Sequence, residues 1–150
     1  MRGQAALAFV SVVTMALATP AAAHATGPHR CECVEYVKRY FGLRGAAGNA
    51  GDMGPYLAAH GFRPTSKPVA GAVAIVQPGY YRHGEGRIYG HAGVISSAWR
   101  EDAKHWSFRL RSANQTAPPG TALGCNNVSV KWFGPFADES RLVSYWLPPH

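Results

Sequence analysis

The sequence is poor in the residues that would assign it to a specialised class of protein. It has three cysteines, too few for a small disulfide-stapled scaffold, and the odd number leaves at least one of them unpaired within the chain. Only 15% of its 150 residues are charged, whereas Gly (17) and Pro (11) are frequent. This composition excludes a coiled coil and a disordered chain, and the length fits one compact domain.

Long apolar runs are confined to the N-terminus. A positive start at Arg2 precedes an apolar segment over residues 5–18, which is followed by Pro20 and by three alanines at 21–23. The segment is shorter than the roughly 20 residues that a membrane span requires, and this order of features is typical of a signal peptide. We therefore expect residues 1–23 to be a cleaved signal peptide and 24–30 a short lead-in. The mature chain should be secreted or periplasmic.

Beyond this segment, the spacing of apolar residues first predicts helices and then strands. Apolar side chains from Cys33 to about Leu43 share one helical face, and a second short helix should begin at Asn49 or Asp52 and end at Gly61. The expected fold class is α+β, with N-terminal helices packed on a small antiparallel sheet of about five strands. The expected strands are at residues 70–76, 91–99, 106–110, 128–132 and 143–147, with a Gly- and Tyr-rich loop at 79–90.

Three residue types in the chain suit amide hydrolysis by a cysteine. This chemistry needs a thiolate, a histidine that carries its proton and a third group that orients the imidazole. Cys33 falls in the first turn of the first expected helix, where the peptide dipoles favour a thiolate. His91 begins a strand and Asn114 ends the next one, so an antiparallel pair of strands could place them side by side.

Five segments occur in an order that is informative. They are Cys33-Val-Glu-Tyr-Val, Gly48-Asn49-Ala50, Pro68-Val-Ala-Gly-Ala-Val-Ala, Gly90-His91-Ala-Gly-Val-Ile and Ser112-Ala-Asn114. Together they resemble the CHAP family (cysteine, histidine-dependent amidohydrolase/peptidase). The resemblance implies a papain-like catalytic domain over residues 31–150 that cleaves amide bonds in peptidoglycan, between muramic acid and L-alanine or within the peptide stems. It also implies that Cys33 is the nucleophile, His91 the general base and Asn114 the orienting residue.

The chain departs from the family pattern at two positions. Many relatives have Gly-Asp at the strand entry, where this chain has Gly71-Ala72, and many have Glu where this chain has Ser112. A carboxylate near the imidazole stabilises its protonated form, so Ser112 puts the rate and the identity of the third residue in question.

Export and the resemblance together bear on the cysteines. Outside the cytosol one disulfide is expected, and if Cys33 is the nucleophile the bridge is Cys31–Cys125. The alternative is a Cys33–Cys125 bridge that leaves Cys31 free. A zinc site at His29, Cys31 and Cys33 with His24 would lack a second cluster of ligands, so we expect neither a metal nor a cofactor.

The remaining features concern partners. Tyr80, Tyr81 and Tyr89 border the expected cleft and are candidates for substrate binding, although a Gly- and Tyr-rich segment is equally compatible with a plain surface loop. The formal net charge of +7 lacks runs of Lys or Arg, which argues against nucleic acid and fits loose attraction to an anionic cell envelope. We expect a monomer that acts on peptidoglycan or another amide polymer. A non-catalytic module that binds cell wall or glycan is the alternative function, and the same site would serve remodelling of the cell's own wall or attack on a competitor.

Overall fold

The computed structural model describes residues 32–84, 86–113 and 128–150. The expected signal peptide and lead-in, together with Cys31, Asn114 and Cys125, lie outside the described residues, so these predictions remain predictions. None of the helices within those three ranges has the length and apolar character needed to cross a membrane.

Two helical segments precede the sheet, as the apolar spacing predicts. The first helix, α1, covers Cys33–Phe41 and ends at Gly42, whose left-handed conformation (φ 67°) lets its N–H bond back to the last turn. A 3-10 turn at Ala50–Asp52 leads into α2, Met53–Ala59. Pro55 is tolerated because it lies in the first turn of α2, where its missing N–H would have no helical partner.

A six-stranded antiparallel sheet forms the other half of the fold, in the order β1-β6-β2-β3-β4-β5. The expectation of about five strands missed β1, which is short, exposed and contains a proline. The loop expected at 79–90 contains a single helical turn, α3 at Gly86–Tyr89, which is closed by the bond from Gly90 N–H to Gly86 O (2.9 Å). The strands are β1 Arg63–Thr65, β2 Val73–Val76, β3 His91–Arg100, β4 His105–Ala113, β5 Val128–Ala137 and β6 Val143–Leu147.

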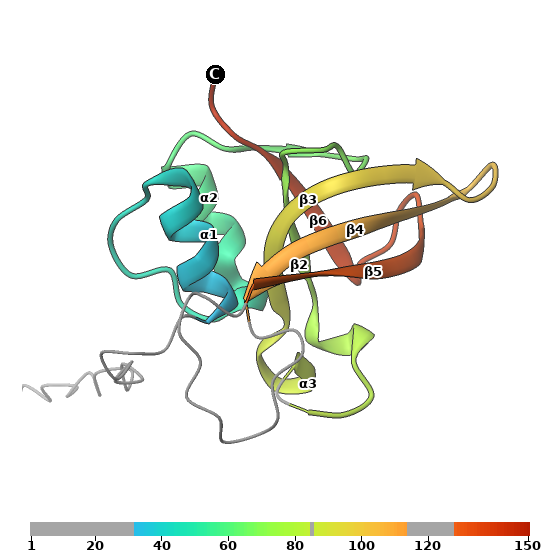
Figure 1. Ribbon diagram of the computed structural model, residues 1–150, viewed down its shortest axis with the longest axis horizontal. Coiled ribbons are helices and arrows are strands. Elements are labelled where there is room, and N and C mark those ends of the chain that lie inside the picture. Colours follow the sequence, from blue (N-terminus) through green and yellow to red (C-terminus); the bar gives the residue numbers. More distant parts are fainter. Residues whose placement is uncertain (1–31, 85, 114–127) are drawn as a thin grey trace, which may run out of the picture.

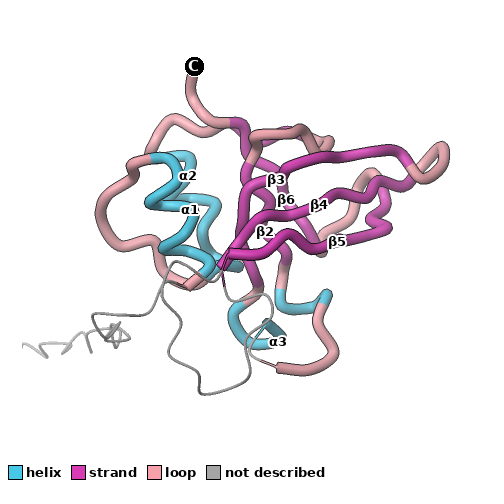
Figure 2. Tube along the Cα trace, viewed as in Figure 1, coloured by secondary structure: helices cyan, strands magenta, loops and turns pink. Residues whose placement is uncertain are grey.

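The central strand β2 divides the interior into two apolar cores. All four of its residues are buried, because α1 and α2 cover one face of the sheet and the curled end of the sheet covers the other (Figures 1 and 2). Val73 and Ile75 pack with Val37 of α1 and Leu57 of α2. The second core lies on the opposite face. Its buried members are Ala72, Ala74, Val76, Ile95, Phe108, Leu110, Phe133, Phe136, Val143 and Tyr145.

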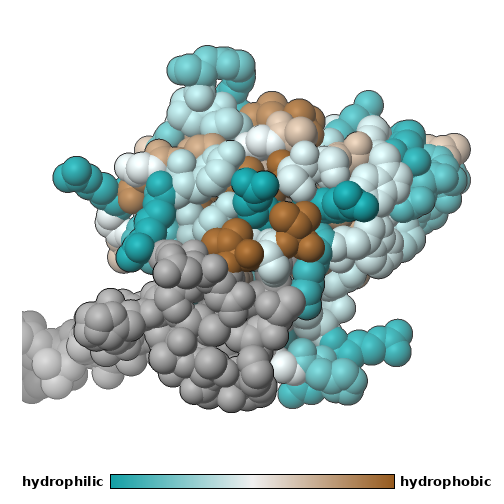
Figure 3. Space-filling view, in the orientation of Figure 1, coloured by the Kyte–Doolittle hydropathy of each residue, from teal (hydrophilic) through white to brown (hydrophobic). Residues whose placement is uncertain are grey.

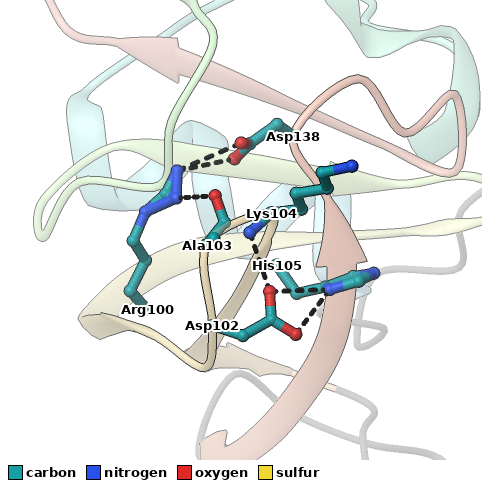
Figure 4. Close-up of polar contacts among 6 residues, drawn as sticks. All are labelled: Arg100, Asp102, Ala103, Lys104, His105 and Asp138. Carbon is teal, nitrogen blue, oxygen red and sulfur yellow. Dashed lines mark hydrogen bonds and ion pairs between the residues drawn. The ribbon is translucent and has the colours of Figure 1, made fainter.

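Polar contacts hold the end of the β3–β4 hairpin that lies away from the helices (Figures 1 and 4). The Arg100 guanidinium donates to both carboxylate oxygens of Asp138 (3.2 and 3.0 Å) and to the carbonyl oxygen of Ala103 (2.6 Å). Asp102 accepts from the backbone N–H of Lys104 (2.7 Å) and contacts Nδ1 of His105 (2.8 Å). Exposed pairs of this kind contribute under about 1 kcal/mol each, so they shape the turn more than they stabilise the fold.

A glycine sets the spacing between β3 and β4. A Cβ at Gly93 would lie 2.6 Å from the carbonyl oxygen of Arg111 and 2.8 Å from Cβ of Ser112. Both obstacles belong to the neighbouring strand and cannot move without separating the two strands. A glycine is therefore required at position 93 because β4 packs too closely on β3 to leave room for a side chain.

We predict that Gly93→Ala lowers the free energy of unfolding by about 1–3 kcal/mol, because it overpacks the contact between two strands. Gly79→Ala is the matched control, since its new Cβ would meet only the tip of the Leu142 side chain, at 3.1 Å. Denaturation midpoints in urea compare the two variants. Equal midpoints would contradict the steric explanation.

Candidate active site

Cys33 is the first residue of α1 and carries a free thiol. Burial is the largest influence on this thiol and raises its pKa from 9.0 to about 11. The backbone N–H groups of Ala92 and Val34 and that of Cys33 itself act in the opposite direction, since each is directed at the sulfur. The free N–H groups at the start of α1 lower the thiol pKa, as expected from its position, but burial has the larger effect in the protein without substrate.

His91 is the first residue of β3 and is only 8% exposed. Gly90 precedes it with φ 72°, and a Cβ there would lie 2.6 Å from the carbonyl oxygen of Val76, so a side chain would push β3 away from β2. The imidazole stacks on the ring of Phe133, with centroids 6.2 Å apart and planes 13° apart. Burial, followed by the positive charge of Lys131, lowers the pKa of His91 from 6.5 to about 4.

The two side chains come from elements that pack on each other. Cys33 and Val34 border the apolar core that contains Val37 and Ala92, so the start of α1 rests on the start of β3. The N–H of Ala92, the residue after His91, is directed at the Cys33 thiol. No hydrogen bond joins the Cys33 sulfur to the imidazole among those formed within residues 32–84, 86–113 and 128–150. Such bonds commonly tighten only when substrate binds.

The imidazole has one nitrogen without a partner. Nε2 of His91 is buried and has no hydrogen-bond partner in the described part of the chain. A buried N–H or lone pair left unpaired costs about 1–3 kcal/mol, so this nitrogen would gain from a further hydrogen-bond partner. Asn114, expected to play that role, lies just beyond the last described residue of β4, Ala113.

The Ser112 side chain forms hydrogen bonds to the backbone. Its hydroxyl is buried and donates to the carbonyl oxygen of Ala92 (2.6 Å), and it also lies 3.3 Å from the carbonyl oxygen of Ala113. A carboxylate could not donate to these carbonyl groups. The serine at this position therefore ties β4 to β3 next to His91.

The three tyrosines expected at the cleft have different surroundings. Tyr80 packs on the rings of Phe133 and Phe136, and so supports the phenylalanine that stacks on His91. Tyr81 crosses Tyr80 edge to face, and its buried hydroxyl has no partner among the described residues. Burial, and next the neighbouring Cys33, raises the pKa of Tyr81. Tyr89 is half-buried in α3.

Sequence reasoning missed the two β5 residues that act on His91. Phe133 lies under the imidazole and Lys131 affects its pKa. The alternation along β5 predicted a strand, but the pairing of β5 with β4 that brings these residues to the site joins parts of the chain about twenty residues apart. Only the order of strands in the sheet could have identified them.

The chain matches the model of a known protein family. The family model described as CHAP domain matches residues 23–110, a span that contains Cys33 and His91. The chain belongs to the CHAP family. The match covers more than half of the chain. It ends before Asn114, so it carries no information on the third residue of the site.

A solved structure shares the fold of this CHAP domain. A crystal structure of N-acetylmuramoyl-L-alanine amidase from Staphylococcus aureus superposes with a TM-score of 0.54 and 16% sequence identity. The alignment covers 79% of this chain and 30% of the amidase chain. The comparison with curated proteins found no match. The likeness supports the α+β, papain-like architecture expected from the sequence.

The burial of His91 predicts a dependence of stability on pH. The unfolded chain takes up a proton near the ordinary pKa of 6.5, whereas the folded chain does so only near 4, so between these values the unfolded state binds more protons. The free energy of unfolding is therefore unaffected by this titration above pH 6.5, and it decreases as the pH falls toward 4, by up to about 3 kcal/mol. The free energy of unfolding of the native chain should therefore fall relative to that of His91→Asn as the pH falls through this window. A constant difference between them would contradict the burial of a neutral imidazole.

Proposed function

We propose that this protein is a secreted hydrolase that cleaves amide bonds in peptidoglycan, with Cys33 as nucleophile and His91 as general base. The observation that carries the proposal is the position of a free thiol at the start of α1, against the backbone N–H that follows His91. Membership of the CHAP family and the fold shared with an amidase support it.

Both groups are uncharged in the resting site at neutral pH, since the thiol pKa is raised and the imidazole pKa is lowered. The proton is then on the sulfur and the base is free to accept it. In the first step His91 removes the thiol proton of Cys33 while the sulfur attacks the scissile carbonyl carbon, and the S–C bond forms. Thiolate and imidazolium charges stabilise each other once both exist.

The negative charge moves to the carbonyl oxygen of the substrate in this step. Backbone N–H groups in the first turn of α1, beginning with that of Cys33, have no helical partner and can donate to this oxygen. The imidazolium of His91 then protonates the leaving amine as the C–N bond breaks. Water, deprotonated by His91, hydrolyses the thioester, which releases the carboxylic acid and restores the thiol.

Asn114 is the proposed orienting residue. A side-chain amide oxygen bonded to one imidazole nitrogen fixes the ring so that the other nitrogen faces the sulfur. Support comes from the unpartnered Nε2 of His91 and from the register of β4, whose Arg111 is opposite Val94 of β3. An antiparallel strand that passes Val94 at Arg111 advances toward His91 as its numbers rise.

We predict that Cys33→Ala and Cys33→Ser abolish release of soluble fragments from purified peptidoglycan, by at least about a thousandfold, because covalent catalysis requires the sulfur. The unfolding midpoint of Cys33→Ala should change little, since the thiol is in no disulfide and, as a weak acceptor, gains little from the backbone N–H groups directed at it. Mass spectrometry of the fragments identifies the amide bond that is cleaved. Retained hydrolysis in Cys33→Ala would overturn the mechanism, and wild-type protein that binds peptidoglycan without releasing fragments would favour the binding module.

A further inference from the structure

A groove lies beside α1, on the face of the sheet that the helix covers only in part. It has a volume of about 270 Å³ and is lined by Tyr40, Gly71, Val94, Ile95, Ser96 and Arg111. Tyr40 is 53% exposed although it is aromatic, and Arg111 is exposed on β4 directly opposite Val94 of β3. An exposed ring and a guanidinium thus face a common hollow.

The groove lies on the same two elements as the catalytic pair. Tyr40 follows Cys33 by seven residues of helix, which corresponds to about 10 Å along the axis. Val94 follows His91 by three residues of strand, again about 10 Å. The ring of Tyr36 lies between, with its centroid 6.1 Å from that of Tyr40. An extended peptide that leaves the catalytic pair along α1 would reach the groove after about three residues.

The groove carries the positive charge of Arg111. Arg111 forms no ion pair within residues 32–84, 86–113 and 128–150, and the α1 carboxylate Glu35 is paired with Lys38 at 2.9 Å. Burial raises the pKa of Tyr36, and the charge of Arg111 opposes that rise. A planar guanidinium beside aromatic rings is suited to pair with a carboxylate through two parallel hydrogen bonds.

Arg111 belongs to a larger exposed surface on β4 and β5. Figure 3 shows hydrophilic and apolar residues side by side on the face of the molecule that it presents. On this surface Arg111 is opposite Val130, and Arg109 is opposite Trp132, which is 51% exposed. Of the two arginines, Arg111 lines the groove and Arg109 does not. Arg109 can therefore serve as the control that separates a specific effect of Arg111 from a general effect of positive charge on this surface.

We propose that the groove between Tyr40 and Arg111 binds a free carboxylate of the peptide stem, about three residues from the scissile amide. Arg111 pairs with the carboxylate and determines specificity for it, while the rings of Tyr36 and Tyr40 contact the intervening peptide. This assignment rests on the proposed function, because it takes Cys33 as the position of the scissile carbonyl. The recognised group is an anionic peptide end rather than a sugar.

The test uses binding to full-length mature protein carrying Cys33→Ala, so that substrate is not consumed. Two synthetic muramyl tripeptides serve as probes, one with a free C-terminal carboxylate and one with a C-terminal amide, both with isoglutamine as the second residue. We expect Arg111→Gln to weaken binding of the free acid by about tenfold and to leave binding of the amide unchanged, as measured by calorimetry. Arg109→Gln should change neither, and unfolding midpoints check that both variants are folded.

The outcomes separate this inference from the proposed function. Equal losses for acid and amide, no loss in Arg111→Gln, or equal losses in Arg109→Gln would each overturn the carboxylate site. Binding of a muramic acid sugar without peptide, at the same affinity as the tripeptide, would also overturn it in favour of glycan. If the carboxylate dependence is found but the wild-type protein does not hydrolyse peptidoglycan, the groove stands and the proposed function fails.

Discussion

The contact between the first turn of α1 and the first residues of β3 is the constraint on which the site depends. It places Cys33 beside the backbone of Ala92 and leaves His91 at the edge of the same contact. Two glycines make it possible, since side chains at Gly90 and Gly93 would collide with β2 and β4. The Gly-His-x-Gly segment is therefore explained by the close packing of three strands around the imidazole.

Burial gives the site its electrostatic character. Enclosure raises the pKa of Cys33 and lowers that of His91, so the resting pair is neutral, and the helix N-terminus only moderates this effect. In the proposed mechanism, charge develops only when a substrate carbonyl is present to receive the sulfur. The β5 strand contributes to the same balance, because Phe133 covers one face of the imidazole and Lys131 disfavours its protonation.

The spacing of apolar residues predicted the individual helices and strands well, but it did not predict how the strands are ordered in the sheet. The spacing of apolar residues located α1, α2 and β6 closely, because each pattern lies within one segment. The three-residue β1 has no such pattern, and it exists because it pairs with β6. Cys33 and His91 could be named from their segments, whereas Phe133, Lys131 and the Arg111 groove depend on strand order. The position of Cys33 at a helix start predicted the effect of the free N–H groups on its pKa, but not the larger opposing effect of burial, which depends on the packing of other elements.

The distance between Cys33 and His91 is tested most directly by dibromoacetone, a short reagent that alkylates a thiol first and then a nucleophile within reach. Peptide mapping by mass spectrometry after treatment should show a three-carbon bridge between Cys33 and His91, and the bridge should be absent in Cys33→Ala and in His91→Asn. A reagent attached to Cys33 alone, or bridged to another residue while His91 stays unmodified, would contradict the assignment of these two residues to one catalytic site.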